Sequence, residues 1–312
     1  MQVHQYHGAA ISQAAGPDHF RLAANLARSR VPLPHSMRFP ADPARTTLPA
    51  AAIAAFNERG YHIQPGVFST AEVAQLNAAA DRVIARDFEK GAPPDGFTGR
   101  DGDPLAVIKI DNAWKADATL ADAALSPRLG HIAAQLIGAP GIRMWHDQLL
   151  DKPAHGGRVI TWHQDWAYWQ MIAECRTVTC WIALDDVRPD SGPMVFLEGS
   201  HKLGIWKLPT GITGDDVQKP AVPADFNGRE VPVIIPKGSV SFHHGLTLHG
   251  SDRNFSAFRR RAFVSHVMST ECTYRPMQEH MNEFVMQKQP DHPAAGEKFR
   301  GPQFPVMWPI AS

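Results

Sequence analysis

The strongest constraint on the fold is a series of short β-like runs that follows Gly138. Turn residues separate the runs, and they do not alternate with helical segments as the strands of a parallel sheet would. Such a density of short strands is typical of a sandwich or a barrel, so we predict a mainly β domain. The predicted strands are residues 142–150, 158–162, 177–184, 194–197, 231–235, 239–242 and 261–268.

Helical patterns precede this region. Residues 51–59 are followed by a glycine, which commonly ends a helix, and residues 61–67 then favour a short strand. Ser69 opens a capping box, with a glutamate three residues later, and apolar residues behind it follow a helical stripe to about residue 86. A further helix is predicted over residues 126–137, because a serine and a proline open it and a glycine follows it.

The remaining segments are predicted to be an extension, a loop and an insertion. Residues 1–47 have weak periodicity, although residues 17–30 could form one helix, and they precede a single domain at 48–312. Residues 91–103 are rich in Gly, Pro and Asp and are predicted to be a loop. Residues 202–223 interrupt the strands with Gly, Pro and a pair of Asp residues, so we predict a long insertion there. Long loops on β scaffolds often act as lids.

Composition argues against several kinds of partner. Lys and Arg number 31, as do Asp and Glu, so no net charge favours nucleic acid. No apolar run is long enough to span a bilayer, and the first residues lack the pattern of a secretory signal. The 3 cysteines include no zinc-like pair of pairs, which predicts reduced thiols in a cytoplasmic protein. We therefore expect neither a nucleic-acid nor a membrane partner.

His163 and Asp165 form the first half of a candidate metal site near the middle of the chain. At the end of a strand, the pleat would send side chains at this spacing to the same face. A second histidine would complete the two-histidine, one-carboxylate triad, which leaves adjacent positions open and suits non-haem Fe(II) oxygen chemistry. Many chains contain a lone His-x-Asp pair, so the prediction depends on a third ligand further along the chain.

The third ligand is predicted to be His249, which precedes Gly250, Ser251 and an arginine-rich strand. Other histidines compete with it for this place: His201, His243 and His244. His243 has the same strand parity as His249, which would also turn it inward, as support for a ligand or as packing.

An arginine after His249 would suit a site for a keto acid. In oxygenases that use 2-oxoglutarate, the metal chelates the keto-acid end, and a cation must hold the distal carboxylate. Arginine offers a rigid fork of donors for this purpose, and Ser251 could add a hydroxyl donor. Spacing does not choose among Arg259, Arg260 and Arg261, although strand alternation turns Arg260 to the opposite face from its two neighbours.

Motifs of several residues surround these candidates. They are WHQD at 162–165, WIALDD at 181–186, SGPM at 191–194 with GSHK at 199–202, and HGS at 249–251 with RRA at 260–262. In this order and spacing they resemble the phytanoyl-CoA dioxygenase family, a branch of the Fe(II)/2-oxoglutarate-dependent oxygenases. The resemblance runs from about residue 55 to residue 269.

The resemblance implies a fold and a set of site residues. The fold is a double-stranded β-helix, a jelly roll of the cupin kind, with helices packed outside. The implied iron ligands are His163, Asp165 and His249, and the implied anchor of 2-oxoglutarate is Arg260 with Ser251.

Three further residues are implied to lie near the cosubstrate: Trp181, Gln164 and Lys109. For Trp181 the alternative is core packing, which is common for a tryptophan on a strand. For Lys109 the alternative is a solvated charge or a salt-bridge partner. Aromatic residues near the metal motif would form either a substrate wall or packing at the end of the barrel: Trp162, Trp166, Tyr168 and Trp169.

The implied activity is that of a dioxygenase that uses Fe(II), 2-oxoglutarate and O₂, hydroxylates a small organic molecule and releases succinate and CO₂. Candidate substrates are secondary metabolites, amino acids and lipid-like acids. Halogenating relatives replace the motif carboxylate with a small residue, whereas this chain keeps Asp165, so hydroxylation is favoured. Desaturation, epoxidation or epimerisation would use the same cofactors.

Two rivals would not use 2-oxoglutarate. One is a non-catalytic cupin-like metal-binding protein, which would not need Arg260. The other is an isomerase or hydrolase that uses the metal as a Lewis acid. Both rivals predict that no succinate forms. The sequence does not predict an oligomeric state.

Overall fold

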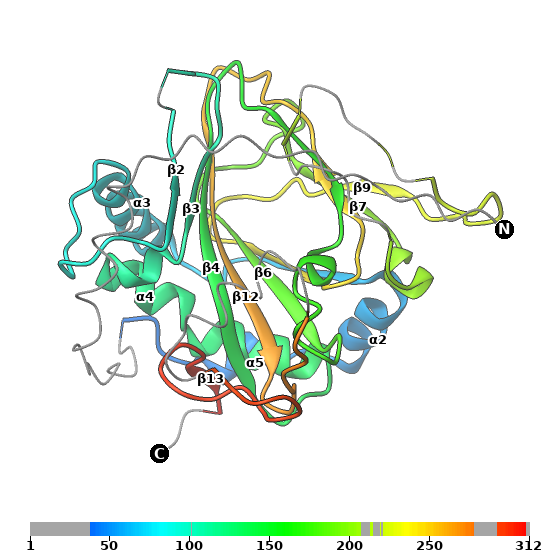
Figure 1. The fold of residues 1–312 in the computed structure, drawn as a ribbon. Coiled ribbons are helices and arrows are strands. Elements are labelled where there is room, and N and C mark those ends of the chain that lie inside the picture. Colours follow the sequence, from blue (N-terminus) through cyan, green and yellow to red (C-terminus); the bar gives the residue numbers. More distant parts are fainter. Residues whose placement is uncertain are drawn as a thin grey trace, which may run out of the picture. The chain divides into compact units, whose positions relative to one another are not determined.

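Two antiparallel β-sheets form the centre of the structure, a computed structural model that describes residues 38–100, 102–206, 213–214, 219, 221–277 and 292–309. The large sheet has the order β1 (Tyr61–Gln64), β10 (Val240–His244), β6 (Thr177–Ala183), β12 (Arg260–Ser269), β4 (Ile142–Lys152), β3 (Ile108–Asp111) and β2 (Gly96–Thr98), and β13 (Val306–Trp308) also pairs with β4. The small sheet has the order β8 (Thr213–Gly214), β5 (Val159–His163), β11 (His249–Ser251), β7 (Met194–Leu197) and β9 (Glu230–Pro232). Together they form the double-stranded β-helix that the resemblance implied (Figure 1).

Apolar side chains from both sheets fill a shared core. In the large sheet, Trp181 of β6 lies directly opposite Val264 of β12 in the strand register. Both belong to a buried cluster that also contains Met194 and Phe196 of β7, in the small sheet. All residues of β12 are buried, because helices cover the face of the large sheet that points away from this core.

The helices pack against the large sheet: Figure 1 shows α5 beside β4 and β12, and α3 and α4 further out, on the side where β2 and β3 lie. Their bounds are α1 (Pro43–Thr46), α2 (Ala50–Arg59), α3 (Thr70–Ile84), α4 (Ala118–Ala124) and α5 (Pro127–Leu136), with short 3-10 turns η3 (Ala113–Lys115), η4 (Asp165–Tyr168) and η5 (Ser200–Leu203). Hydrogen bonds join the two layers: the Ser265 hydroxyl donates to the carbonyl of Ala124 at 2.8 Å, and the Asn77 amide donates to the carbonyl of Leu184 at 2.9 Å.

Most elements predicted from the sequence are confirmed. The predicted helices correspond to α2, α3 with its capping box, and α5. The predicted strands of the β region correspond to β4, β5, β6, β7, β10 and β12, whereas the strand predicted at 231–235 is too long, since β9 ends at Pro232. The strand predicted at 61–67 is too long, because the chain turns after Gln64 at Gly66, whose φ is +64°. The loop predicted at 91–103 is wrong at its centre, where β2 forms the edge of the large sheet.

The elements that the prediction missed are short. β3 has the buried residues Ile108 and Ile110 in alternation, but its four residues are too few for a clear pattern. α4 is stabilised at its start by Asp117, whose carboxylate accepts hydrogen bonds from two backbone N–H groups. β11 has no apolar alternation and is a strand because β5 and β7 pair with it on either side.

The predicted N-terminal extension enters the described part of the chain at Arg38. Phe39 is fully buried against Phe68, with their ring centroids 5.4 Å apart, so this part of the extension packs on the domain. The helix considered at 17–30 lies outside the described residues, as does most of the predicted insertion at 202–223. Within that insertion, the backbone of β8 pairs with β5.

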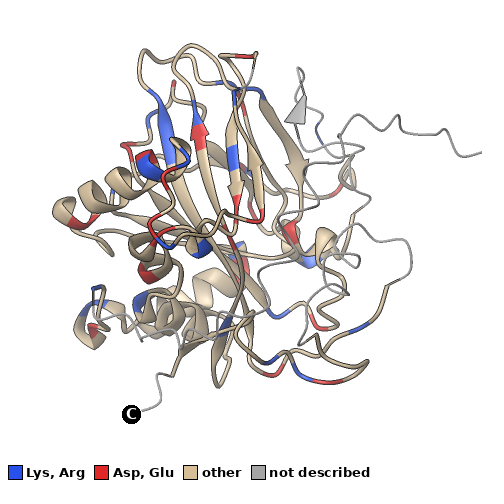
Figure 2. Ribbon diagram, turned by 60° about the vertical axis from the view of Figure 1, so that its left-hand side comes forward, with Lys and Arg blue, Asp and Glu red and all other residues tan. Residues whose placement is uncertain are grey.

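Charged residues of both signs are spread along the described helices and strands (Figure 2). This distribution agrees with the equal numbers of acidic and basic residues in the sequence. None of the described helices has the length and apolar character needed to cross a membrane.

Candidate active site

The structure brings the predicted ligands His163, Asp165 and His249 together at the small sheet. His163 ends β5 and His249 begins β11, and the two are direct partners in the strand register. Asp165 opens η4, immediately after β5. One ligand atom from each residue lies within 4.8 Å of the others, and no other group of at least three His, Cys, Asp or Glu side chains in the described chain meets this criterion.

Backbone carbonyls orient both histidine rings. The Nδ1 atom of His163 lies 2.7 Å from the carbonyl oxygen of Thr161, and the Nδ1 atom of His249 lies 2.9 Å from that of Thr247. A carbonyl can only accept, so both Nδ1 atoms carry the proton and both Nε2 atoms present a lone pair. Each Nε2 lies 3.7 Å from Oδ1 of Asp165. This donor set fits a divalent cation such as Fe(II).

The second oxygen of Asp165 is held by the large sheet. His243 Nε2 lies 3.0 Å from Oδ2, and the Thr179 hydroxyl donates to the same oxygen at 2.5 Å. His243 of β10 and Thr179 of β6 are partners in the strand register. His243 therefore faces inward, as its parity predicted, and the two residues fix the direction in which Oδ1 points.

Burial and neighbouring charge favour the protonation states that a metal ion needs. Burial lowers the pKa of His163 to about 4, and the nearby His249 adds to the effect. Burial likewise lowers the pKa of His249 to about 4. Burial alone would raise the pKa of Asp165, but His249, His243 and His266 outweigh it and hold that pKa well below its usual range. At neutral pH the site thus offers neutral imidazoles and an ionised carboxylate.

The competing histidines lie elsewhere. His201 follows Ser200 in η5, and its Nε2 lies 3.0 Å from the carbonyl oxygen of Asn57. His244 accepts a hydrogen bond at Nδ1 from the backbone N–H of Leu246 at 3.1 Å. Neither belongs to the group of converging ligand atoms.

Arg260 is buried at the start of β12, with 2% of its surface exposed. Its guanidinium donates to the carbonyl of Gly192 at 2.8 Å, and its Nε atom has no hydrogen-bond partner among the described residues. Gly192 has φ +65°, and a Cβ there would lie 2.6 Å from the backbone oxygen of Asp252, so this close approach requires glycine. Burial lowers the pKa of Arg260 to about 10.

The neighbouring arginines point the other way and have acidic partners. Arg259 pairs with Asp185 at 3.2 Å, and Arg261 pairs with Asp151 at 2.8 Å. Within the described chain, no salt bridge joins Arg260 to a carboxylate, so alternation along β12 separates one unpaired guanidinium from two paired ones.

Trp181 packs in the core and also contacts Arg260. Its ring belongs to the buried core cluster, and the guanidinium carbon of Arg260 lies 5.4 Å from the ring centroid. The aromatic face therefore stabilises the buried cation while it packs the core.

Sequence reasoning missed Lys152, the last residue of β4. Lys152 lies directly opposite Arg260 in the strand register and has 1% of its surface exposed. Its ammonium donates to the hydroxyl of Ser251 at 2.9 Å and also to the carbonyl of Asp252. The sequence shows only a lysine at the end of a long strand of mixed apolar and polar residues, and the strand register is what places it beside Arg260.

Gln164 uses its side-chain amide to hold backbone groups together. Its Nε2 donates to the carbonyls of Gly204 and Leu246, both at 2.8 Å, and its Oε1 accepts from the N–H of Trp206 at 2.8 Å. Gln164 is 1% exposed. Gln164, which lies between two predicted ligands, thus connects the end of β5 to the chain after η5.

Lys109 lies on β3 and forms an ion pair with Asp111. Its Nζ is 2.7 Å and 2.8 Å from the two carboxylate oxygens, and about a third of each side chain is exposed, 36% and 31%. Asp111 also accepts from the Gln148 amide at 2.8 Å.

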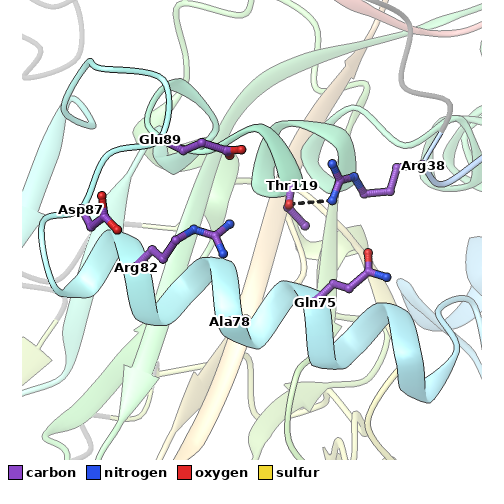
Figure 3. A pocket seen from close by; sticks show the side chains of 7 residues that line it. All are labelled: Arg38, Gln75, Ala78, Arg82, Asp87, Glu89 and Thr119. Carbon is purple, nitrogen blue, oxygen red and sulfur yellow. Dashed lines mark hydrogen bonds between the residues drawn. The ribbon is translucent and has the colours of Figure 1, made fainter.

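Two surface pockets lie away from the triad. Figure 3 shows one of about 500 Å³ over α3 and α4. Its arginines already have partners, since Arg82 pairs with Asp117 at 2.6 Å and Arg38 with Asp122 at 3.0 Å. A second, of about 330 Å³, lies beside α2 and α5. Neither is lined by a residue of the triad: the residues are Arg38, Gln75, Ala78, Arg82, Asp87, Glu89 and Thr119 for the first, and Ile53, Phe56, Asn57, Gln135, Leu136, Ile137, Gly138, Cys175, Arg176 and His244 for the second.

Comparisons with known proteins agree with this site. The family model of phytanoyl-CoA dioxygenase (PhyH) matches residues 56–262. The chain is similar to the ectoine dioxygenase of Stutzerimonas stutzeri strain A1501, with 27% identity over 238 residues that cover 69% of this chain and 77% of that protein.

Solved structures share the fold. The carbocyclase SnoK from nogalamycin biosynthesis, a non-heme alpha ketoglutarate dependent enzyme, has a TM-score of 0.62 and 26% identity, covering 86% of this chain and 98% of its own. EctD from S. alaskensis, solved with 2-oxoglutarate and 5-hydroxyectoine, has a TM-score of 0.63 and 23% identity, covering 89% and 99%.

The fold and the triad define a double-stranded β-helix protein with a two-histidine, one-carboxylate metal site. The family match spans most of both sheets and all three triad residues. The chain belongs to the phytanoyl-CoA dioxygenase family, as the sequence motifs indicated.

Proposed function

We propose that this chain is an Fe(II)- and 2-oxoglutarate-dependent dioxygenase that hydroxylates a small organic molecule. The observation that carries the proposal is the triad: two lone-pair nitrogens and one carboxylate oxygen face one another, and the other carboxylate oxygen is fixed by His243 and Thr179. Membership of the phytanoyl-CoA dioxygenase family supports the same function.

His163, Asp165 and His249 would hold the iron. Arg260 and Ser251 would bind the distal carboxylate of 2-oxoglutarate, because both are buried donors and Arg260 has no carboxylate partner among the described residues. When bound, iron and 2-oxoglutarate activate O₂ for oxidation of a C–H bond, with release of succinate and CO₂.

The residues of the chain contribute orientation and exclusion of water. Carbonyl groups hold the two imidazoles as neutral ligands, and two donors hold the carboxylate in one direction. Phe196 packs between the metal side and the core, with its ring centroid 5.1 Å from that of His243 and 6.4 Å from that of His249. Such apolar cover strengthens the electrostatic interactions at the site.

Trp181, Gln164 and Lys109 remain proposals as cosubstrate residues. The contact between Trp181 and Arg260 supports a place for Trp181 in the wall of the carboxylate pocket. For Gln164, three hydrogen bonds to backbone groups favour a positioning role. For Lys109, a place near the cosubstrate would require its ammonium to leave or share Asp111.

The relatives support a small-molecule substrate. One is named an ectoine dioxygenase, and a structural neighbour is a carbocyclase of nogalamycin biosynthesis. The carbocyclase shows that this fold also carries outcomes other than hydroxylation, so desaturation, epoxidation, epimerisation or ring closure is the alternative for this chain. Tyr168, whose ring centroid lies 6.0 Å from that of His163, would line the substrate side.

Anaerobic titration tests the proposal. Fe(II) followed by 2-oxoglutarate should produce a visible charge-transfer band, and His163→Ala should abolish it. With candidate substrates and O₂, succinate should form in proportion to oxidised product. Protein that binds Fe(II) but gives no band and no succinate would instead be a cupin-like metal-binding protein.

A cytoplasmic location remains part of the proposal. All three cysteines are free thiols, as a reducing compartment would keep them: Cys175, Cys180 and Cys272. A fractionation experiment on cells that express the tagged protein would test it.

A further inference from the structure

We propose that Lys152 is a positioning residue for 2-oxoglutarate: its ammonium holds the oxygen of Ser251, so that the Ser251 hydroxyl proton is directed to the distal carboxylate, and its charge adds to that of Arg260. This inference rests on the proposed use of 2-oxoglutarate. It assigns a role to a side chain that the family motifs in the sequence did not single out.

The position of Lys152 follows from the register of the large sheet. Lys152 ends β4 opposite Arg260, the first residue of β12. Directly opposite residues of an antiparallel pair have their side chains on the same face, so the two cations enter the same region. A Cβ at Gly157 would lie 2.2 Å from Cγ of Lys152, so this glycine allows the lysine stem to pass the backbone.

The hydrogen bonds of Lys152 determine what Ser251 can do. An ammonium has only donors, so the Ser251 oxygen accepts its proton at 2.9 Å. The serine's own proton is then not needed for Lys152 and is available to another acceptor. Arg260 also has an Nε atom without a described partner. A carboxylate bound here would accept from both residues and satisfy both donors.

The charges lead to the same conclusion. Neither Lys152 nor Arg260 forms a salt bridge within the described chain, although both are almost fully buried. Burial of unpaired charge is costly, and an anion between two such cations offsets that cost. Burial, and then the nearby Arg260, lower the pKa of Lys152 well below its usual range, and a carboxylate bound beside it would raise that pKa again.

The rival explanation is purely structural, since Lys152 also donates to the carbonyl of Asp252 and so holds the chain after β11. The two explanations predict different effects when Lys152 is replaced. If Lys152 is a positioning residue, only keto acids with a distal carboxylate should bind more weakly. If its role is structural, every keto acid that binds the metal should bind more weakly.

The test compares 2-oxoglutarate with 2-oxopentanoate, which has the same keto-acid end but no distal carboxylate. Fe(II)-loaded wild type, Lys152→Met and Ser251→Ala are titrated anaerobically with each acid, and the charge-transfer band gives Kd. Lys152→Met should raise Kd for 2-oxoglutarate by roughly 10- to 100-fold, the range for a hydrogen-bonded charge. Kd for 2-oxopentanoate should stay within about twofold. In the Ser251→Ala background, Lys152→Met should have a smaller effect, because the residues act together.

The matched control is Lys115→Met, since Lys115 pairs with Asp95 on the outer surface and should leave both Kd values unchanged. The inference is overturned if Lys152→Met weakens the binding of both acids equally, or if it weakens the binding of neither. If Lys152→Met does not fold, Lys152→Gln keeps a donor for Asp252 without the charge and should show the same selective loss. If the wild type binds Fe(II) but gives no band with 2-oxoglutarate, the proposed function itself fails.

Discussion

The metal end and the carboxylate end of the site hold their charges in opposite ways. At the metal end, the carboxylate of Asp165 is surrounded by imidazoles and hydrogen-bond donors, and a cation is what the arrangement accepts. At the carboxylate end, Arg260 and Lys152 are buried with only carbonyl and hydroxyl acceptors in the described chain. The metal end therefore offers one carboxylate with donors on either side, whereas at the carboxylate end a bound anion would give two buried cations a direct ionic partner.

The largest effect is expected at the metal end. Asp165→Ala removes the one anionic ligand and leaves His243 and Thr179 without their acceptor. Affinity for Fe(II) should fall by more than roughly 100-fold, the upper end for loss of a residue that only supports a ligand. Isothermal titration under anaerobic conditions measures it. His201→Ala is the control, because His201 bonds to a backbone carbonyl away from the triad. This variant should bind iron with the affinity of the wild type. Iron affinity retained in Asp165→Ala would remove the basis for the metal site.

Arg260→Met should separate the two ends. Iron affinity should be unchanged, whereas Kd for 2-oxoglutarate should rise by about 100-fold, because truncation of one member of a buried, hydrogen-bonded charge pair costs about 2–5 kcal/mol. The ligand-free protein should not lose stability, since an unpaired buried cation is replaced by an apolar side chain. The matched control is Arg259→Met, whose partner Asp185 lies on the other face. A loss of iron binding in Arg260→Met would contradict the separation.

A smaller effect is expected from the residues that orient the metal ligand. Thr179→Val keeps the shape of the side chain but removes the hydroxyl that donates to Asp165. Iron affinity should fall by roughly 10-fold, since outer hydrogen-bond partners of metal ligands contribute about 10- to 100-fold. Thr177→Val, on the same strand, is the control because no described hydrogen bond joins Thr177 to the triad. An equal change in both variants would indicate general loosening of β6.

The two ends also differ in how much of them the sequence could reveal. His163 and Asp165 are neighbours in the chain, so strand parity alone placed them on one side. Lys152 is separated from Arg260 by more than 100 residues, and only the pairing of β4 with β12 brings them together. The contact between His243 and Asp165 likewise depends on β10 and β6. Periodicity predicts elements, but register between distant strands is set by the tertiary fold.

A histidine outside the site, His244, should contribute to the loss of stability in acid. Burial lowers the pKa of His244 to about 4, and its Nδ1 accepts from the N–H of Leu246, so protonation breaks that bond. Between about pH 4 and the unfolded value of about 6.5, the unfolded chain binds more protons. Stability therefore rises with pH and is lost as pH falls, by up to about 1.4 kcal/mol per pH unit from this residue.

Urea unfolding of iron-free protein at pH 7 and pH 5 measures this dependence. His244→Gln keeps an acceptor for Leu246 but does not titrate, so the variant should lose less stability on acidification than the wild type does. His201→Gln is the comparison on η5, where the ring is also partly buried and burial also lowers the pKa. An unchanged pH slope in His244→Gln would assign the acid sensitivity to histidines at the metal end instead.

The smallest effect is expected from Lys109, and it sharpens the contrast with Lys152. The ammonium of Lys109 already has a carboxylate partner in Asp111, and 36% of its side chain is exposed. An exposed ion pair contributes about 0–1 kcal/mol, so Lys109→Met should change Kd for 2-oxoglutarate by less than about fivefold. Lys152→Met, measured beside it, removes a buried lysine without a described carboxylate partner. If Lys109→Met raises Kd for 2-oxoglutarate by about 10-fold or more and leaves Kd for 2-oxopentanoate unchanged, Lys109 lies at the distal carboxylate, as the sequence resemblance implied. Its ammonium would then leave Asp111 when the cosubstrate binds.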